Sequence, residues 1–165
     1  MWYLIKGVVL TKDNLAKRNW HGNKKCVFCT ANESIQHLFI DCHFAKFVWR
    51  LVQWCFGLSK PRSVRNIFGA WLTGVPLKTK KLIITGASAA CWAIWISRND
   101  LVFNKTTMLT SLQVLFRMTH WLRCWTFLHN EEAKNKINQA CRCLETVAMQ
   151  FYYKYGWSFS NRIQF

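Results

Sequence analysis

The chain has 165 residues and a formal net charge of +16 at pH 7, with seven acidic against 23 basic side chains. Apolar residues make up 52% of the chain and aromatic residues 16%, a composition that favours a packed core and excludes an intrinsically disordered chain. The charge makes a polyanion the expected partner, nucleic acid first and an acidic membrane surface second; a solvated basic face without a ligand is the alternative.

The N-terminal residues, beginning Met1-Trp-Tyr, lack both the basic start and the small-residue cleavage site of a signal peptide. We therefore expect an intracellular protein, nuclear or cytoplasmic. Thr11 predicts the N-cap of a short helix over residues 12–18, with Asp13 placed to favour the helix dipole.

A basic cluster surrounds Trp20 in this region. Phosphate pairing beside a stacking ring is how proteins contact single-stranded nucleic acids, which predicts a nucleic-acid contact here. The alternative is that Trp20 packs under the knuckle formed by the Cys26-x2-Cys29 motif that follows, while the lysines are solvated. The cluster consists of Lys12, Lys17, Arg18, Lys24 and Lys25, with Trp20 as the candidate stacking ring.

The next stretch has the spacing C-x2-C-x7-H-x4-C, formed by Cys26, Cys29, His37 and Cys42. Three thiols and one imidazole are the donors of a structural tetrahedral zinc site, so we predict one structural Zn(II) with these four ligands and no open position. Two alternatives are reduced core residues that are merely close in sequence, and disulfides, which fit poorly with a chain that shows no export signal.

The same stretch predicts its local structure. Thr30 and Glu33 have the spacing of a capping box that would begin a helix carrying His37. On a continuous helix His37 and Cys42 would point about 140° apart, so we predict a break near Asp41. His43 adjoins Cys42 but would point elsewhere on a helix, and Cys42 is the expected ligand.

Helical spacing dominates the rest of the chain. Apolar residues from Phe44 to Leu58 recur at three- and four-residue steps, and this predicts an amphipathic helix. Breaker residues follow at 57–62 and 74–76, around a short helix at 64–72. Residues 78–103 predict one long helix that is apolar nearly all round and therefore central to the core. Its apolar stretch, 82–96, is shorter than the ~20 residues of a membrane span.

The C-terminal third predicts two paired helices. A turn is expected at 104–107, followed by a capping box at Thr110 and Gln113 and a helix to Trp125. Asn130 predicts the next N-cap, and the helix after it should end at Gly156. A two-residue turn would join the pair into an αα-hairpin. Cys141 and Cys143 are too close in sequence to share one helical face.

The chain lacks the clustered carboxylates that polymerases and nucleases use to hold two metals. Its aspartates are isolated in sequence, at 13, 41 and 100, and no nucleotide-binding glycine motif or nucleophile elbow occurs. An enzyme is therefore not expected.

These motifs resemble the zinc-binding region of plant non-LTR (LINE-type) reverse transcriptases. The similar residues are Leu10 to Trp20, the four Cys and His positions, Glu33-Ser34, Leu38-Phe39, Phe44-Ala45, Val48-Trp49, the W-x2-W-x2-RN-x3-F run from Trp92 to Phe103, and the end at Tyr155-Gly156-Trp157. The resemblance implies a non-catalytic part of a polymerase polyprotein, truncated at its N-terminus.

We therefore expect a mostly α protein in which a small C-C-H-C zinc lobe precedes a helical bundle. The expected boundaries are 1–58 for the lobe, 59–77 for a linker with a short helix, 78–157 for the helical region and 158–165 for a tail. The expected partners are RNA or DNA, without sequence specificity, and a polymerase domain; no small-molecule substrate and no membrane are expected. The alternative functions are a structural or protein-interaction fragment and a retroelement relic without activity.

Overall fold

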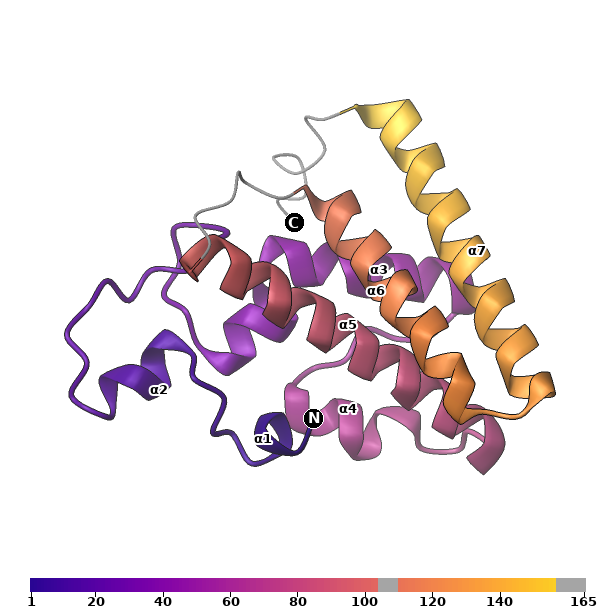
Figure 1. Cartoon of the computed structure of the whole chain (residues 1–165), viewed down its shortest axis with the longest axis horizontal. Helices are drawn as coiled ribbons and strands as arrows, with labels where there is room; N and C mark the ends of the chain where they lie inside the picture. Colours follow the sequence, from indigo (N-terminus) through magenta and orange to yellow (C-terminus); the bar gives the residue numbers. More distant parts are fainter. Residues whose placement is uncertain (104–109, 157–165) are drawn as a thin grey trace.

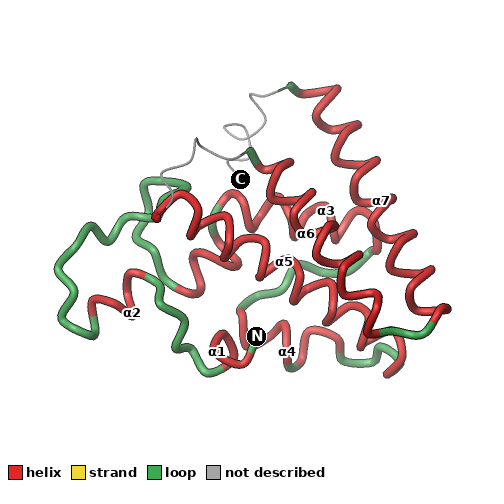
Figure 2. The backbone as a smooth tube through the Cα atoms, viewed as in Figure 1, coloured by secondary structure: helices red, strands yellow, loops and turns green. Residues whose placement is uncertain are grey.

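The computed structural model describes residues 1–103 and 110–156 and confirms a mostly α protein. Within these ranges the chain forms helices and turns but no strand (Figures 1 and 2). The elements are α1 (Trp2–Ile5), α2 (Lys12–Ala16), a π-helical turn (His37–Asp41), α3 (His43–Phe56), α4 (Val64–Phe68), a 3-10 turn (Ala70–Leu72), α5 (Leu77–Phe103), α6 (Ser111–Trp125), a 3-10 turn (Thr126–Leu128) and α7 (Glu131–Tyr155).

Helix α5 lies in the middle of the molecule, with α1 and α2 towards its left and lower side in Figure 1 and α6 and α7 towards its right. It begins directly after Pro76, which cannot donate a helical hydrogen bond and so suits a helix start. Its buried residues include Ala87, Ala90 and Ala93, whose small side chains let neighbouring helices approach closely. The long central helix predicted at 78–103 is thus confirmed.

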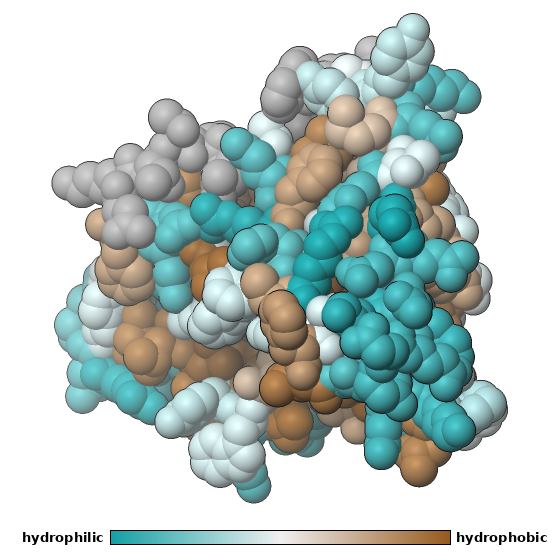
Figure 3. Space-filling view, turned by 45° about the vertical axis from the view of Figure 1, so that its right-hand side comes forward, coloured by the Kyte–Doolittle hydropathy of each residue, from teal (hydrophilic) through white to brown (hydrophobic). Residues whose placement is uncertain are grey.

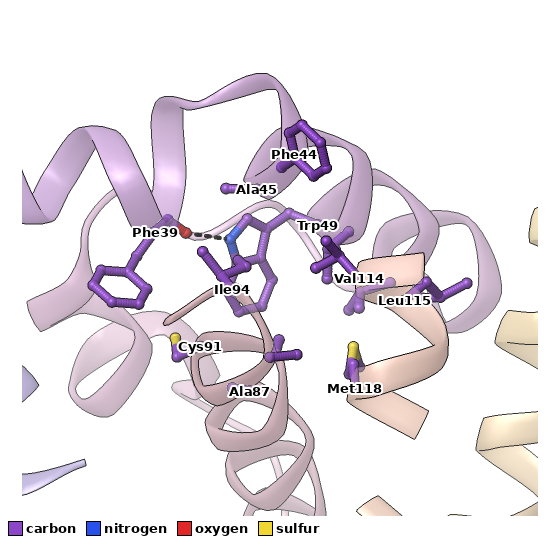
Figure 4. Close-up of a cluster of buried hydrophobic side chains, with 14 of the residues drawn as sticks. Phe39, Phe44, Ala45, Trp49, Ala87, Cys91, Ile94, Val114, Leu115 and Met118 are labelled. Carbon is purple, nitrogen blue, oxygen red and sulfur yellow. Dashed lines mark hydrogen bonds between the residues drawn. The ribbon is translucent and has the colours of Figure 1, made fainter. Parts of the chain in front are cut away.

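The core is continuous from the Cys- and His-bearing segment to α7. Trp49 of α3 is 1% exposed, and its indole N–H donates to the carbonyl oxygen of Phe39 at 2.8 Å. Around it lie side chains from α5 and α6, including Ile94 and Met118 (Figure 4). The N-terminal segment therefore shares one core with the long helices. The predicted domain boundaries, after residue 58 and before residue 78, stay predictions.

Helices α6 and α7 form the predicted αα-hairpin. Thr110 and Gln113 make the reciprocal capping box, and the Asn130 side chain accepts from the N–H of Ala133 at 3.0 Å. The joint is longer than the predicted two residues, because a 3-10 turn at Thr126–Leu128 continues α6 before Asn130. Gly156, at φ +64°, ends α7 as expected.

Several details at element ends differ from or lie outside the predictions. Helix α2 ends at Ala16, two residues early, because the chain turns through Asn19 at φ +62°. The predicted turn at 104–107 and the tail at 158–165 lie outside the described residues.

No helix in the described ranges is long and apolar enough to span a membrane. Apolar side chains also reach the surface in patches, visible on the face in Figure 3.

An ion pair between Arg123 and Glu145 holds α6 against α7, with two N–O distances of 2.6 and 2.7 Å. The Arg123 guanidinium, helped by the Thr119 hydroxyl, lowers the pKa of the Glu145 carboxyl from its ordinary value of 4.5. A carboxyl whose pKa is lower in the folded than in the unfolded state stabilises the fold above the ordinary pKa. That contribution is lost as the pH falls through the lowered pKa.

Replacing Glu145 by glutamine is therefore expected to cost about 1 kcal/mol of unfolding free energy at pH 7, a small value because water screens the pair. Urea titrations should show a constant difference from the unmodified chain at pH 5 to 8 and a shrinking one below pH 4.5. The control is Glu131→Gln, since the Glu131 side chain is 80% exposed and its ion pair is with Lys134, one turn along the same helix. If Glu145→Gln and the unmodified chain had the same free energy of unfolding at pH 7, the expectation would be contradicted.

Candidate metal centre

A tight backbone loop holds the first two cysteines. Lys25 and Asn32 form an antiparallel bridge, flanked by hydrogen bonds from Cys26 N–H to the Ala31 carbonyl and from Glu33 N–H to the Lys24 carbonyl. The Phe28 N–H points back at the Cys26 sulfur, 3.4 Å away. An N–H aimed at sulfur stabilises the thiolate form that a metal requires. The two-residue spacing thus folds into a knuckle.

The other two side chains come from the π-helical turn. His37 lies at its start and Cys42 directly after its end, where the backbone is extended at φ −61° and ψ +146°. The Cys42 N–H bonds to the His37 carbonyl, five residues back. The predicted helix break near Asp41 is confirmed. On a continuous helix the Cys42 side chain would point away from His37, whereas after the break the two side chains belong to one group of donors.

The four donor atoms of Cys26, Cys29, His37 and Cys42 lie within 4.8 Å of one another. The sulfur of Cys29 is 3.2 Å from Nε2 of His37. Zinc takes thiolates at about 2.3 Å and imidazoles at about 2.0–2.1 Å, so four donors grouped this closely are compatible with one tetrahedral ion. In the described part of the chain no other group of three or more Cys, His, Asp or Glu side chains is similarly gathered.

The sulfurs influence one another strongly. Hydrogen bonds from Cys42, His37 and the Phe28 N–H lower the pKa of Cys26 to about 4 despite its burial. The pKa of Cys42 is raised, because its thiol donates to Cys26 and because it is buried. Burial also raises the pKa of Cys29. Three thiolates and a neutral imidazole around Zn(II) would give the site one net negative charge. Lys24 and Lys25 directly precede Cys26 in the sequence, so their positive charges would offset it.

His43 is close to the cluster without belonging to the group of four. Its Nδ1 lies 3.9 Å from the Cys42 sulfur, while its ring packs against Phe44. Burial lowers its pKa and so favours the neutral form. The expectation that Cys42 rather than His43 is the ligand is consistent with this arrangement and stays a prediction.

Glu33 does not cap a helix, so the predicted capping box with Thr30 is wrong. Ser34 caps the turn that carries His37 instead, because its hydroxyl accepts a hydrogen bond from the His37 N–H at 3.0 Å. The Glu33 carboxylate is buried and accepts from Nη2 and Nε of Arg98 on α5, at 2.8 and 3.3 Å. It also accepts from the Lys12 N–H at the start of α2. Sequence reasoning missed this pair because the partners are 65 residues apart.

Two lysines of the predicted basic cluster make hydrogen bonds within the protein, and the cluster's other three cations are exposed to solvent. Lys12 is half-buried and its ammonium donates to the Lys25 carbonyl, while Lys17 donates to the side chain of Asn14. Arg18, Lys24 and Lys25 are exposed. Trp20 is 37% exposed and its ring covers Gly22, where an added Cβ would lie 2.0 Å from a ring carbon. Trp20 therefore packs on its own backbone and keeps part of its ring in solvent.

The geometry of the four donors can now be set beside known proteins. Residues 1–49 match the family described as zinc-binding in reverse transcriptase. The match includes all four donor residues and ends within α3, and together with the cluster it supports a reverse transcriptase zinc-binding domain at this end of the chain. No curated protein and no solved structure matches the chain.

Proposed function

We propose that the chain is a non-catalytic, zinc-stabilised module that binds RNA or DNA through its phosphates, without sequence specificity. The observation that carries the proposal is a four-donor cluster on a chain with a net charge of +16. Cys26, Cys29, His37 and Cys42 are the proposed ligands. Four protein ligands complete a tetrahedral zinc site, so the ion would stabilise the fold without a coordination position for a substrate.

The carboxylates support a non-catalytic role. Glu33, Asp100 and Glu145 each pair with an arginine from a different part of the chain. Glu131 and Glu132 pair with lysines one turn further along α7. Two-metal phosphoryl chemistry instead needs carboxylates gathered around one point. We propose that polymerisation belongs to a separate domain, and that the chain derives from a plant non-LTR retrotransposon reverse transcriptase, which the run from Trp92 to Phe103 resembles.

A second candidate function is a structural or protein-interaction fragment. The first ten residues favour it, because Trp2 and Tyr3 are 63% and 65% exposed and lie beside other exposed apolar side chains. Exposed apolar patches mark protein contacts or self-association. Light scattering of the isolated chain separates the two candidates, since a monodisperse monomer argues against this one.

The nucleic-acid proposal predicts a steep dependence of affinity on salt. Each phosphate contact to a single strand contributes about 0.7 to the slope of log K against log salt. Replacing Lys24 and Lys25 together by glutamine should therefore lower the slope by about 1.4 and weaken binding at low salt. Fluorescence anisotropy of a labelled oligonucleotide, measured across a salt series, gives both quantities.

The matched control is Lys134→Gln with Lys136→Gln, which removes the same charge from side chains that pair with Glu131 and Glu132 on α7. The control should leave the slope near that of the unmodified chain. Equal losses in both double variants would indicate nonspecific charge attraction over the whole surface. Affinity that is flat across the salt series would contradict phosphate binding.

A further inference from the structure

A groove lies between the N-terminal segment and α5, outside the metal centre. It has a volume of about 460 Å³. Tyr3 and Leu10 line one side, Trp92 and Trp95 of α5 line the other, and Arg18 also contributes to the lining. Ligand sites for small organic groups have volumes of about 300–1,000 Å³, so the groove is large enough for a nucleobase with its sugar.

The two tryptophans of the groove have different surroundings. Trp95 is already packed: it stacks with Phe39 at 6.5 Å between ring centroids, and the Arg98 guanidinium lies 5.2 Å from its ring. Trp92 is 39% exposed and meets Trp121 edge-on, at an interplanar angle of 84°. In the described part of the chain no ring stacks parallel on Trp92, so this ring can take a flat partner.

Arg18 gives the groove its charge. It is exposed, and its side chain forms no hydrogen bond or ion pair within residues 1–103 and 110–156. An unpaired guanidinium beside an aromatic wall suits a ligand that is both anionic and flat. An apolar protein segment would use the wall but leave the guanidinium without a partner. Among polyanions, a single strand presents unstacked bases next to phosphates, and a duplex does not.

We propose that this groove binds one unpaired nucleotide of a single-stranded nucleic acid, with its base stacked on Trp92 and its phosphate bound by Arg18. The proposal rests on the nucleic-acid-binding function proposed above and gives it a site. It also connects that function to α5, because Arg18 belongs to the predicted basic cluster and Trp92 to the central helix.

The test uses the full zinc-loaded chain and a labelled oligothymidylate of twelve nucleotides. Stacking on an aromatic side chain is worth about 1–3 kcal/mol per base, so Trp92→Leu should weaken binding by about 5- to 160-fold. Trp92→Phe keeps a flat ring and should recover most of the affinity. The control is Trp54→Leu on α3, because Trp54 is 53% exposed and stacks on Phe151, and both residues are outside the set that lines the groove. This variant should bind like the unmodified chain.

A second oligonucleotide of the same length, with abasic sites in place of the bases, isolates the stacking contribution. On this ligand Trp92→Leu should bind as well as the unmodified chain. Arg18→Gln should weaken binding to both ligands and lower the salt slope by about 0.7. Equal zinc content and equal helical circular dichroism establish that each variant is folded.

Three results would overturn the proposal. Normal binding by Trp92→Leu, combined with weak binding by the Lys24 and Lys25 variant, removes the groove but leaves the proposed function intact; a groove that serves a protein segment gives this result. Equal losses in Trp92→Leu and Trp92→Phe, or the same loss on the abasic ligand, show that no base stacks there. Failure of the unmodified chain to bind either oligonucleotide overturns the groove and the proposed function together.

Discussion

Replacing Cys42 by serine is expected to abolish stoichiometric zinc binding and with it the ordered N-terminal region. Cys42 is fully buried, and its position directly after the π-helical turn places its sulfur beside the donor atoms of the other three predicted ligands. Structural zinc contributes roughly 10–16 kcal/mol of apparent binding free energy, more than most domains have as total stability. Elemental analysis should find one zinc per unmodified chain, and a chelator should produce the same loss of structure as the substitution.

Cys124→Ser is the matched control for this experiment. Cys124 is half-buried on α6, 3.7 Å from His120 and outside the group of four. The control should retain full zinc content and an unchanged urea midpoint. Full zinc content in Cys42→Ser would overturn the four-ligand site. Zinc loss without loss of structure would instead mean that the shared core alone holds the segment in place.

Replacing Arg98 by methionine is expected to lower the free energy of unfolding by about 3–5 kcal/mol, because it leaves the buried Glu33 carboxylate without a counter-charge. The Arg98 and Glu33 side chains are 3% and 0% exposed, and the pair joins the metal-binding loop to α5. Urea denaturation at neutral pH, with saturating zinc, measures the change.

The double variant Arg98→Met with Glu33→Gln provides a check on the cause. A neutral amide can still accept from the Lys12 N–H and carries no charge to be compensated, so the double variant should be more stable than Arg98→Met alone. Lys136→Met is the control, because it breaks a pair with Glu132 that is exposed to water, and it should leave the free energy of unfolding nearly unchanged. A cost below 1 kcal/mol for Arg98→Met would contradict a buried pair.

Short-range signals predicted much of the fold and the cluster. Each of these signals depends on residues within a few turns of one another: the Cys and His spacing, the break before Cys42, the caps at Thr110 and Asn130, and the apolar middle of α5. Such interactions are set by local backbone geometry and side-chain chemistry, so they can be read from neighbouring positions.

The parts that sequence reasoning missed depend on contacts between distant segments. The short spacing of Thr30 and Glu33 fits a cap, but the buried bond to Arg98 determines where the carboxylate lies. The groove between residues 1–10 and α5 likewise has no sequence signal, because it exists only when the N-terminal segment folds over the central helix. Tertiary burial therefore overrides the local preference at Glu33, as it commonly does for weak propensities.

The π-helical turn between His37 and Cys42 makes the number of intervening residues matter more than their identity. An insertion or deletion of one residue there would rotate whatever follows by about 100° and point Cys42 away from its partners. Conservative exchanges among the apolar positions 38–40, by contrast, keep the geometry. Natural variants of this segment should therefore keep a fixed length, and their exchanges at the buried positions 38–40 should be among apolar side chains of similar volume.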